Sequence, residues 1–249
     1  VRLLVAEVSG GRQIRESVRR TEITRMGEGL HRGGRLLPAA AERTAQMVGR
    51  FVAEARSCGA EAILVAGTSA AREASDGREF LKALATELGV SGVTLSGRQE
   101  AEAAYAGVTQ DVPGDPVVLD IGGGSTELSR RRGIRFETKS LDMGTSKATE
   151  RWIAGDPPRP EQVAAVRATV EDTVRREAGR FQAGERMGPL VGVAGTVTTV
   201  ACLAAGLEHY DRDALHLSPL TRDDVERQLD RLSAMTTAER AALGCVQAG

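Results

Sequence analysis

The chain is poor in aromatic residues and has almost no net charge. Aromatic residues make up 3% of its 249 residues, which leaves few rings on which nucleic-acid bases could stack. Its 33 basic and 34 acidic residues nearly cancel, so no overall positive field attracts a nucleic acid. No apolar run approaches the roughly 18 residues that a membrane-spanning helix needs. We therefore expect neither nucleic acid nor a membrane as a partner.

Cysteine and histidine are also scarce. The three cysteines, Cys58, Cys202 and Cys245, lie far apart, and this odd, dispersed set argues against a disulfide framework and a zinc ribbon. The three histidines form no His-x-His or His-Glu-x-x-His motif, so a metal would be held by oxygen, as Mg²⁺ or Mn²⁺ is. Because no basic start with an apolar stretch forms a signal peptide, we expect a cytoplasmic protein.

What is present is an alternation of short apolar strands and amphipathic helices. Residues 62–66 are continuously apolar, which is typical of a strand buried on both faces of a sheet, and residues 117–121, apolar except for Asp120, also predict a buried strand. Residues 38–56 instead carry apolar side chains at helical spacing. This pattern predicts an α/β fold. Turn formers are densest at residues 111–116, so we predict two α/β domains, 1–107 and 108–249.

Both ends of the sequence look internal. Residues 1–8 resemble the middle of a strand without an initiator methionine, and residues 245–249 follow a capped helix and stop. We therefore expect an interior slice of a longer chain. Each half opens with an apolar strand, a hairpin and helices; if this symmetry holds, the glycine turn of the first half would precede residue 1.

A glycine-rich segment, residues 120–127, follows the strand at 117–121. Its glycines let the backbone approach a ligand and point several N–H groups at one spot, which suits a phosphate. Ser125 and Thr126 add hydroxyl donors, and Asp120 and Glu127 make sense if Mg²⁺ lies between carboxylate and phosphate. The alternative is a hairpin turn with an incidental acid at each end. The three glycines are Gly122, Gly123 and Gly124.

A second strand, 190–193, leads through Gly195 and Thr196 into a helix. A helix N-terminus with a Gly-Thr entry is a ready anion site. The alternative is an ordinary N-cap by Thr196.

Two further strand ends carry charged residues at the start of a helix. Residues 67–72 place Arg72 where a guanidinium could bind phosphate, although a capped helix with a surface arginine is equally typical. Residues 96–101 bring Arg98 and Glu100 to a helix start. Glu100 could activate a water as a general base, but on spacing alone an acid that complements the helix dipole is favoured.

A basic run, Arg130-Arg131-Arg132, leads into a return strand at 134–139. Such a run between two strands commonly faces water. We interpret it as a solvated turn rather than as a binding site.

The segments 67–72, 96–101, 120–127 and 193–196 together resemble, in order and spacing, the exopolyphosphatase and guanosine-pentaphosphate phosphatase family. The glycine turn alone also occurs elsewhere in the actin-like, sugar-kinase and Hsp70 ATPase superfamily, whereas the four segments together are specific. The resemblance implies two actin-like (ribonuclease H-like) α/β domains with an active-site cleft between them. It also implies cleavage of terminal phosphates from polyphosphate or guanosine pentaphosphate, assisted by Mg²⁺.

The resemblance also implies roles by position. Glu100 matches the catalytic base that activates water, which reverses the interpretation from spacing. Asp120 and Glu127 match the acidic residues around the metal, and Arg72 matches a substrate-contacting arginine. The positions assigned to phosphate binding are Gly122, Gly123, Gly124, Ser125, Thr126, Gly144, Gly195 and Thr196, with Arg98 as a further basic candidate.

We thus expect an Mg²⁺-dependent exopolyphosphatase, and the resemblance makes a homodimer plausible. Two alternatives stay open: guanosine pentaphosphate as the main substrate, and a phosphate- or nucleotide-binding regulator without catalysis. One departure from the family supports the regulator. In the family, a first phosphate loop of the Asp-x-Gly-x-Asn-Ser type directly precedes the strand that corresponds to residues 1–8, and the sequence given does not contain this loop.

Overall fold

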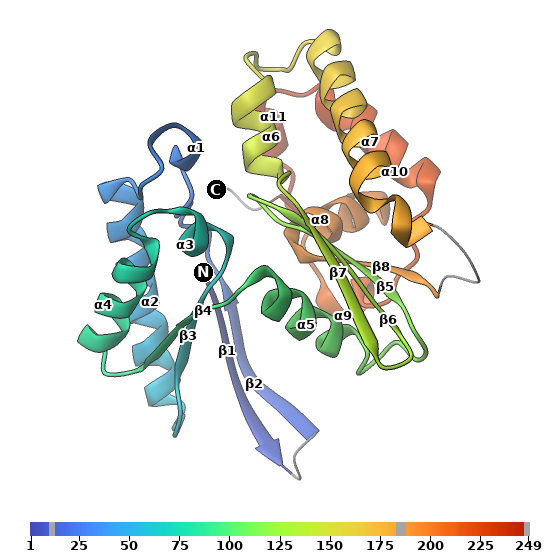
Figure 1. Ribbon diagram of the computed structural model, residues 1–249. Coiled ribbons are helices and arrows are strands. Elements are labelled where there is room, and N and C mark those ends of the chain that lie inside the picture. Colours follow the sequence, from blue (N-terminus) through green and yellow to red (C-terminus); the bar gives the residue numbers. More distant parts are fainter. Residues whose placement is uncertain (10–12, 183–187, 247–249) are drawn as a thin grey trace. The chain divides into compact units, whose positions relative to one another are not determined.

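The computed structural model describes residues 1–9, 13–182 and 188–246, and it divides the chain into two compact units. Unit 1 is Val1–Ser96 and unit 2 is Gly97–Ala248. The predicted boundary lay at residue 107, whereas the structure divides the chain at residue 96. The difference is one helix, 97–108, which packs on the sheet of unit 2. Figure 1 shows the helices and strands of the two units.

Unit 1 contains two small sheets and its helices. An antiparallel pair joins β1 to β2, and a parallel pair joins β3 to β4. The predicted turn at residues 10–11 lies outside the described residues. The elements of unit 1 are β1 (Arg2–Ser9), β2 (Gln13–Thr21), α1 (Leu30–Gly33), α2 (Pro38–Ser57), β3 (Leu64–Gly67), α3 (Ser69–Glu73), α4 (Gly77–Glu87) and β4 (Ser91–Thr94).

Helix α2 shows why unit 1 folds as the sequence predicts. A proline starts the helix, where its missing N–H costs nothing. The buried positions on α2 recur every three or four residues, and Val48 and Val52 pack with Leu84 of α4. The apolar stripe therefore faces the interior of the unit.

Unit 2 is built on a four-stranded sheet with the order β7-β6-β5-β8. Strand β5 runs antiparallel to β6 and parallel to β8. The elements of unit 2 are α5 (Gly97–Val108), β5 (Val117–Ile121), β6 (Thr126–Arg132), β7 (Arg135–Leu141), α6 (Thr145–Trp152), α7 (Pro160–Gln182), β8 (Leu190–Val193), α8 (Ala194–Ala204), α9 (Arg212–Leu215), α10 (Arg222–Ser233) and α11 (Thr237–Ala241).

Helices cover both faces of this sheet. On one face, Tyr105 of α5 packs edge-on against Phe136 of β7, with ring centroids 5.5 Å apart. On the other face, α7 lies along the sheet (Figure 1). Arg130 of β6 donates there to the Phe181 carbonyl of α7 at 3.2 Å. Since side chains alternate along a strand, the face under α5 also carries Glu127. The α/β class and the buried strand at 117–121 are thus confirmed.

The basic run is not the solvated turn that we predicted. Its residues close strand β6, and Arg130 is 5% exposed. The Arg130 guanidinium pairs with Glu137, directly opposite on β7, at 2.9 Å and lies over the Phe181 ring. Arg130 therefore ties the hairpin to α7, while Arg131 and Arg132 are exposed.

The cysteines also depart from the prediction. Cys202 of α8 forms a disulfide with Cys245, and both residues are buried in a cluster with Leu203 and Leu215. The sequence separation of 43 residues hid this pairing, because only folding of the segment around α9, α10 and α11 brings the two thiols together. Cys58 is an exposed free cysteine.

Within the ranges given above, no helix combines the length and the low polarity that crossing a bilayer requires.

Candidate functional site

The glycine turn, residues 122–125, connects β5 to β6. Gly122 N–H donates to the Ser125 carbonyl at 3.0 Å and closes the turn. The N–H groups of Gly123, Gly124 and Ser125 donate to no acceptor in the described part of the chain. Three such donors in successive residues at a glycine-rich turn form a nest for an anion.

The carbonyls of the turn are held by the start of α6. Thr145 N–H donates to the Gly122 carbonyl at 3.0 Å, and Ser146 N–H donates to the Gly123 carbonyl at 2.9 Å. The first donors of α6 are therefore occupied by the protein itself. Because the carbonyls of the turn point at α6, its N–H groups are left for another partner.

Gly144 lies directly against the glycine turn. A Cβ on Gly144 would collide with the backbone of Gly123 and would lie 2.5 Å from the Gly124 nitrogen. This is a close approach of two backbones, which glycine alone permits. The structure thus gives Gly144 a packing role in shaping the turn; its assignment to phosphate binding stays a prediction.

The two hydroxyl residues of the segment differ in their surroundings. Ser125 lies within the turn and is 8% exposed. The Thr126 hydroxyl donates to the Met143 carbonyl at 2.6 Å, which joins the turn to the residues before α6. The single proton of this hydroxyl is thus used inside the protein, and Thr126 supports the turn.

Two carboxylates meet at the base of the turn. Asp120 and Glu127 are directly opposite each other in the β5–β6 ladder, so both side chains lie on the same face, with Cβ atoms about 4.5–5.5 Å apart. Glu127 is 5% exposed, and Ser140 Oγ donates to its Oε1 at 2.8 Å. The structure therefore brings together the two acids that the sequence singled out.

This pair fits Mg²⁺ better than a fully protein-coordinated metal. Among the described residues, no three histidine, cysteine, aspartate or glutamate side chains cluster as a metal site. Mg²⁺ usually keeps several waters and takes one or two carboxylates together with substrate phosphates. Asp120 and Glu127 supply that set, and the buried carboxylate of Glu127 favours a nearby cation.

The start of α8 lies beside the glycine turn. Strand β8 runs parallel to β5 with Val193 opposite Asp120, so both strands end at the same edge of the sheet. The N–H groups of Gly195 and Thr196, in the first turn of α8, donate to no backbone carbonyl among the described residues. Thr196 lies inside the helix, so the alternative that it is an N-cap is wrong.

The chain enters α8 through an unusual backbone conformation. Ala194 has a φ of 71°, which is uncommon for a residue with a side chain and costs about 1–3 kcal/mol. Gly195 meets nothing within 4 Å of a built Cβ, so it faces open space.

Helix α5 carries Arg98 and Glu100 in its first turn. It packs through buried Ala101 and Tyr105 on the face of the sheet that holds Asp120 and Glu127. Arg98 pairs with Glu102 at 2.9 Å and lies 5.6 Å from the centre of the Phe136 ring.

Arg72 belongs to unit 1. It lies at the end of the short helix α3, where it is half-buried, and its Nη1 donates to the Leu95 carbonyl at 2.9 Å. Arg72 thereby joins α3 to the segment that follows β4.

Two residues at the site were not expected from the sequence. Ser140 is the hydrogen-bond donor to Glu127, and Thr145 holds the Gly122 carbonyl. A serine in a strand carries no local signal of such a contact. Only the register between β6 and β7, which sets Ser140 opposite Glu127, could have indicated it.

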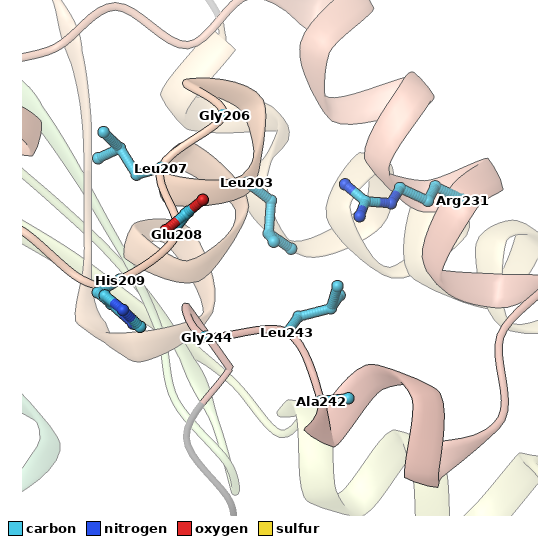
Figure 2. Close-up of a pocket in the computed structure, with 9 residues that line it drawn as sticks. All are labelled: Leu203, Gly206, Leu207, Glu208, His209, Arg231, Ala242, Leu243 and Gly244. Atoms are coloured by element: carbon cyan, nitrogen blue, oxygen red, sulfur yellow. The ribbon is translucent and has the colours of Figure 1, made fainter.

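A separate pocket of about 450 Å³ in unit 2 is lined by the end of α8, by α10 and by the residues that follow α11 (Figure 2). Leu203, Leu207 and Leu243 give it an apolar wall, with His209 and Arg231 at its sides. None of the predicted site residues lines it.

Comparison with known proteins agrees with these features. The family model described as "Ppx/GppA phosphatase family" matches residues 4–249. Exopolyphosphatase 2 of Mycobacterium tuberculosis is 32% identical over 266 aligned residues, which cover 100% of this chain and 81% of that protein.

Solved structures give the same result. The crystal structure of an exopolyphosphatase-like protein has a TM-score of 0.88 and 28% identity, and the match covers 99% of this chain and 78% of that one. The PPX-GPPA enzyme of Aquifex aeolicus has a TM-score of 0.77 and 27% identity, with 99% and 81% covered.

Proposed function

The chain belongs to the Ppx/GppA phosphatase family, and from this premise we propose that it is an exopolyphosphatase that hydrolyses the terminal phosphate of inorganic polyphosphate with Mg²⁺. Membership makes a phosphate-releasing hydrolase the reaction class. The exact substrate and the metal are our proposals.

The observation that carries the proposal is the set of free N–H groups beside two carboxylates. Three come from the glycine turn and two from the start of α8, at one edge of the sheet. Phosphoryl transfer depends mainly on positioning and on neutralising charge, and fixed backbone donors do both. We propose that the terminal phosphate binds to the glycine turn, with Gly195 and Thr196 on the neighbouring wall.

Glu100 is the proposed general base. Its helix lies on the same face of the sheet as Asp120 and Glu127, which supports this assignment. A carboxylate in that role takes a proton from water as the water attacks the terminal phosphorus. Arg72 and Arg98 are proposed to contact the anionic chain, and Gly144 acts through the shape of the turn.

Asp120 and Glu127 are the proposed ligands of Mg²⁺. When bound, the ion neutralises charge on the phosphate oxygens. The chain's own part is to hold two carboxylates at adjacent positions of a rigid ladder, so that they need not rearrange.

Guanosine pentaphosphate is the second candidate substrate, because it also ends in a terminal phosphate that the glycine turn could bind. The matching family is described as a phosphatase family under two names, Ppx and GppA. A homodimer and a cytoplasmic location complete the proposal.

Orthophosphate release tests the proposed function. We expect the intact protein to release phosphate from polyphosphate with Mg²⁺ and to lose this activity in a chelator. A higher kcat/KM on guanosine pentaphosphate would reassign the substrate. Absence of release from both substrates would contradict the enzyme and favour a phosphate-binding regulator.

A further inference from the structure

Glu127 is buried with very little support from the protein. Its side chain is 5% exposed, and Ser140 is its only hydrogen-bond donor among the described residues. No ion pair within those residues reaches it. A buried carboxylate is costly unless it is paired or hydrogen-bonded, so one neutral hydroxyl leaves it incompletely compensated.

Ser140 reaches Glu127 because of the strand register. Ser140 of β7 lies directly opposite Glu127 of β6, and Glu127 lies directly opposite Asp120 of β5. The three residues therefore form a row across one face of the sheet, beneath the glycine turn. Ser140 lies on the edge strand and donates to Oε1 at 2.8 Å.

We propose that Ser140 is a positioning residue that aims Glu127 at the divalent cation. Its hydroxyl holds Oε1, which leaves Oε2 as the oxygen that faces the ion. An ionised carboxylate only accepts, so the serine proton fixes the orientation without competing for the metal. This inference deepens the proposed function and rests on it for the presence of Mg²⁺.

The test is Mg²⁺ binding by calorimetry, without substrate, to Ser140→Ala and Ser140→Thr. We expect Ser140→Ala to weaken binding about 10–100-fold, as loss of a partner that orients a metal ligand does. Ser140→Thr keeps the hydroxyl and suits a strand, so it should bind within a few-fold of wild type. In turnover, Ser140→Ala should raise the Mg²⁺ concentration for half-maximal rate, with KM for polyphosphate nearly unchanged.

Ser129→Ala is the matched control. Ser129 lies on β6, two residues from Glu127 and on the same face of the sheet. It is 2% exposed and lies opposite Val118 and Thr138 instead of the acids. It should leave Mg²⁺ affinity unchanged. An equal loss in Ser129→Ala would show general damage to the sheet and overturn the proposal.

Two other outcomes would also overturn it: wild-type affinity in Ser140→Ala, or no Mg²⁺ binding by the wild type. These are distinct from failure of the function, which is read from phosphate release by the wild type. If the wild type releases phosphate and Ser140→Ala binds Mg²⁺ as the wild type does, the proposed enzyme stands and the positioning role of Ser140 is contradicted. If Ser140→Ala binds Mg²⁺ more weakly but the wild type releases no phosphate, the positioning role stands and the proposed enzyme is contradicted.

Discussion

The glycine turn and the start of α8 present the same chemistry in different ways. Both follow parallel neighbouring strands. Within the described chain, the turn leaves three backbone N–H groups without a backbone acceptor and the start of α8 leaves two. The turn is fixed by other segments, through Gly144 and the first N–H groups of α6. The start of α8 instead follows Ala194, whose φ is 71°, and no segment approaches Gly195 within 4 Å of a built Cβ among the described residues.

This difference shows which substitutions should disrupt each proposed anion site. A nest whose carbonyls are held by a second segment depends on close packing at a distant position in the sequence. A helix start depends on its own backbone conformation, and Gly195 there has free space around it. We therefore expect substitutions of the two glycines, Gly144 and Gly195, to differ strongly.

The largest expected effect is that of Gly144→Ala. The new methyl group must push the backbone of Gly123 and Gly124 aside, which should lower the free energy of unfolding by about 1–3 kcal/mol. Because a shift of about 1 Å in a binding group can cost about 100-fold in rate, phosphate release should fall at least that much. Chemical denaturation and orthophosphate assays measure the two effects.

Gly195→Ala is the matched variant in the other region. A methyl group there meets nothing within 4 Å, so unfolding free energy should change by less than about 1 kcal/mol. Equal destabilisation by both variants would contradict the contrast between the two regions.

A smaller effect is expected on the stability of the fold at low pH. The Arg130 guanidinium, which hydrogen-bonds Glu137, holds the pKa of that carboxyl below its ordinary value of about 4.3. A carboxyl with a lowered folded-state pKa contributes stability above its unfolded pKa and loses it as pH falls through the folded value. This ion pair lies on β6 and β7, the hairpin that carries Glu127 and Ser140.

Thermal unfolding at about pH 6 and about pH 3 checks this, since the two values bracket the ordinary glutamate pKa. Wild type should lose stability on acidification, and Glu137→Gln should be less stable at the higher pH but lose less on acidification. An equal loss of thermal stability on acidification in both proteins would show that the Arg130–Glu137 ion pair does not stabilise this hairpin.

Much of the fold could be predicted from local pattern. The strands at 117–121 and 190–193 are where the sequence placed them, and the Thr-x-x-Glu spacing of Thr236 and Glu239 forms a capping box. Asp76 shows what local pattern cannot predict. It occupies the N-cap position of α4, but its carboxylate accepts a hydrogen bond from Leu36 N–H at 3.0 Å instead of from the helix.

The sequence predicts which segments form the candidate site, but it does not predict how their side chains and backbones contact one another. Residue type and spacing singled out Asp120 and Glu127, and the ladder places them opposite each other. The packing of Gly144, the donor Ser140 and the buried Arg130 depend on contacts between segments that no local spacing encodes. The Cys202–Cys245 disulfide was missed for the same reason.

The central claim is that this site hydrolyses polyphosphate with Glu100 as the base. The most direct measurement is orthophosphate release from polyphosphate by Glu100→Gln beside the wild type, with Mg²⁺ and with matched thermal unfolding. The account predicts a loss of about 100–10,000-fold in kcat with an unchanged fold. Turnover near the wild-type rate in a folded Glu100→Gln protein would contradict it.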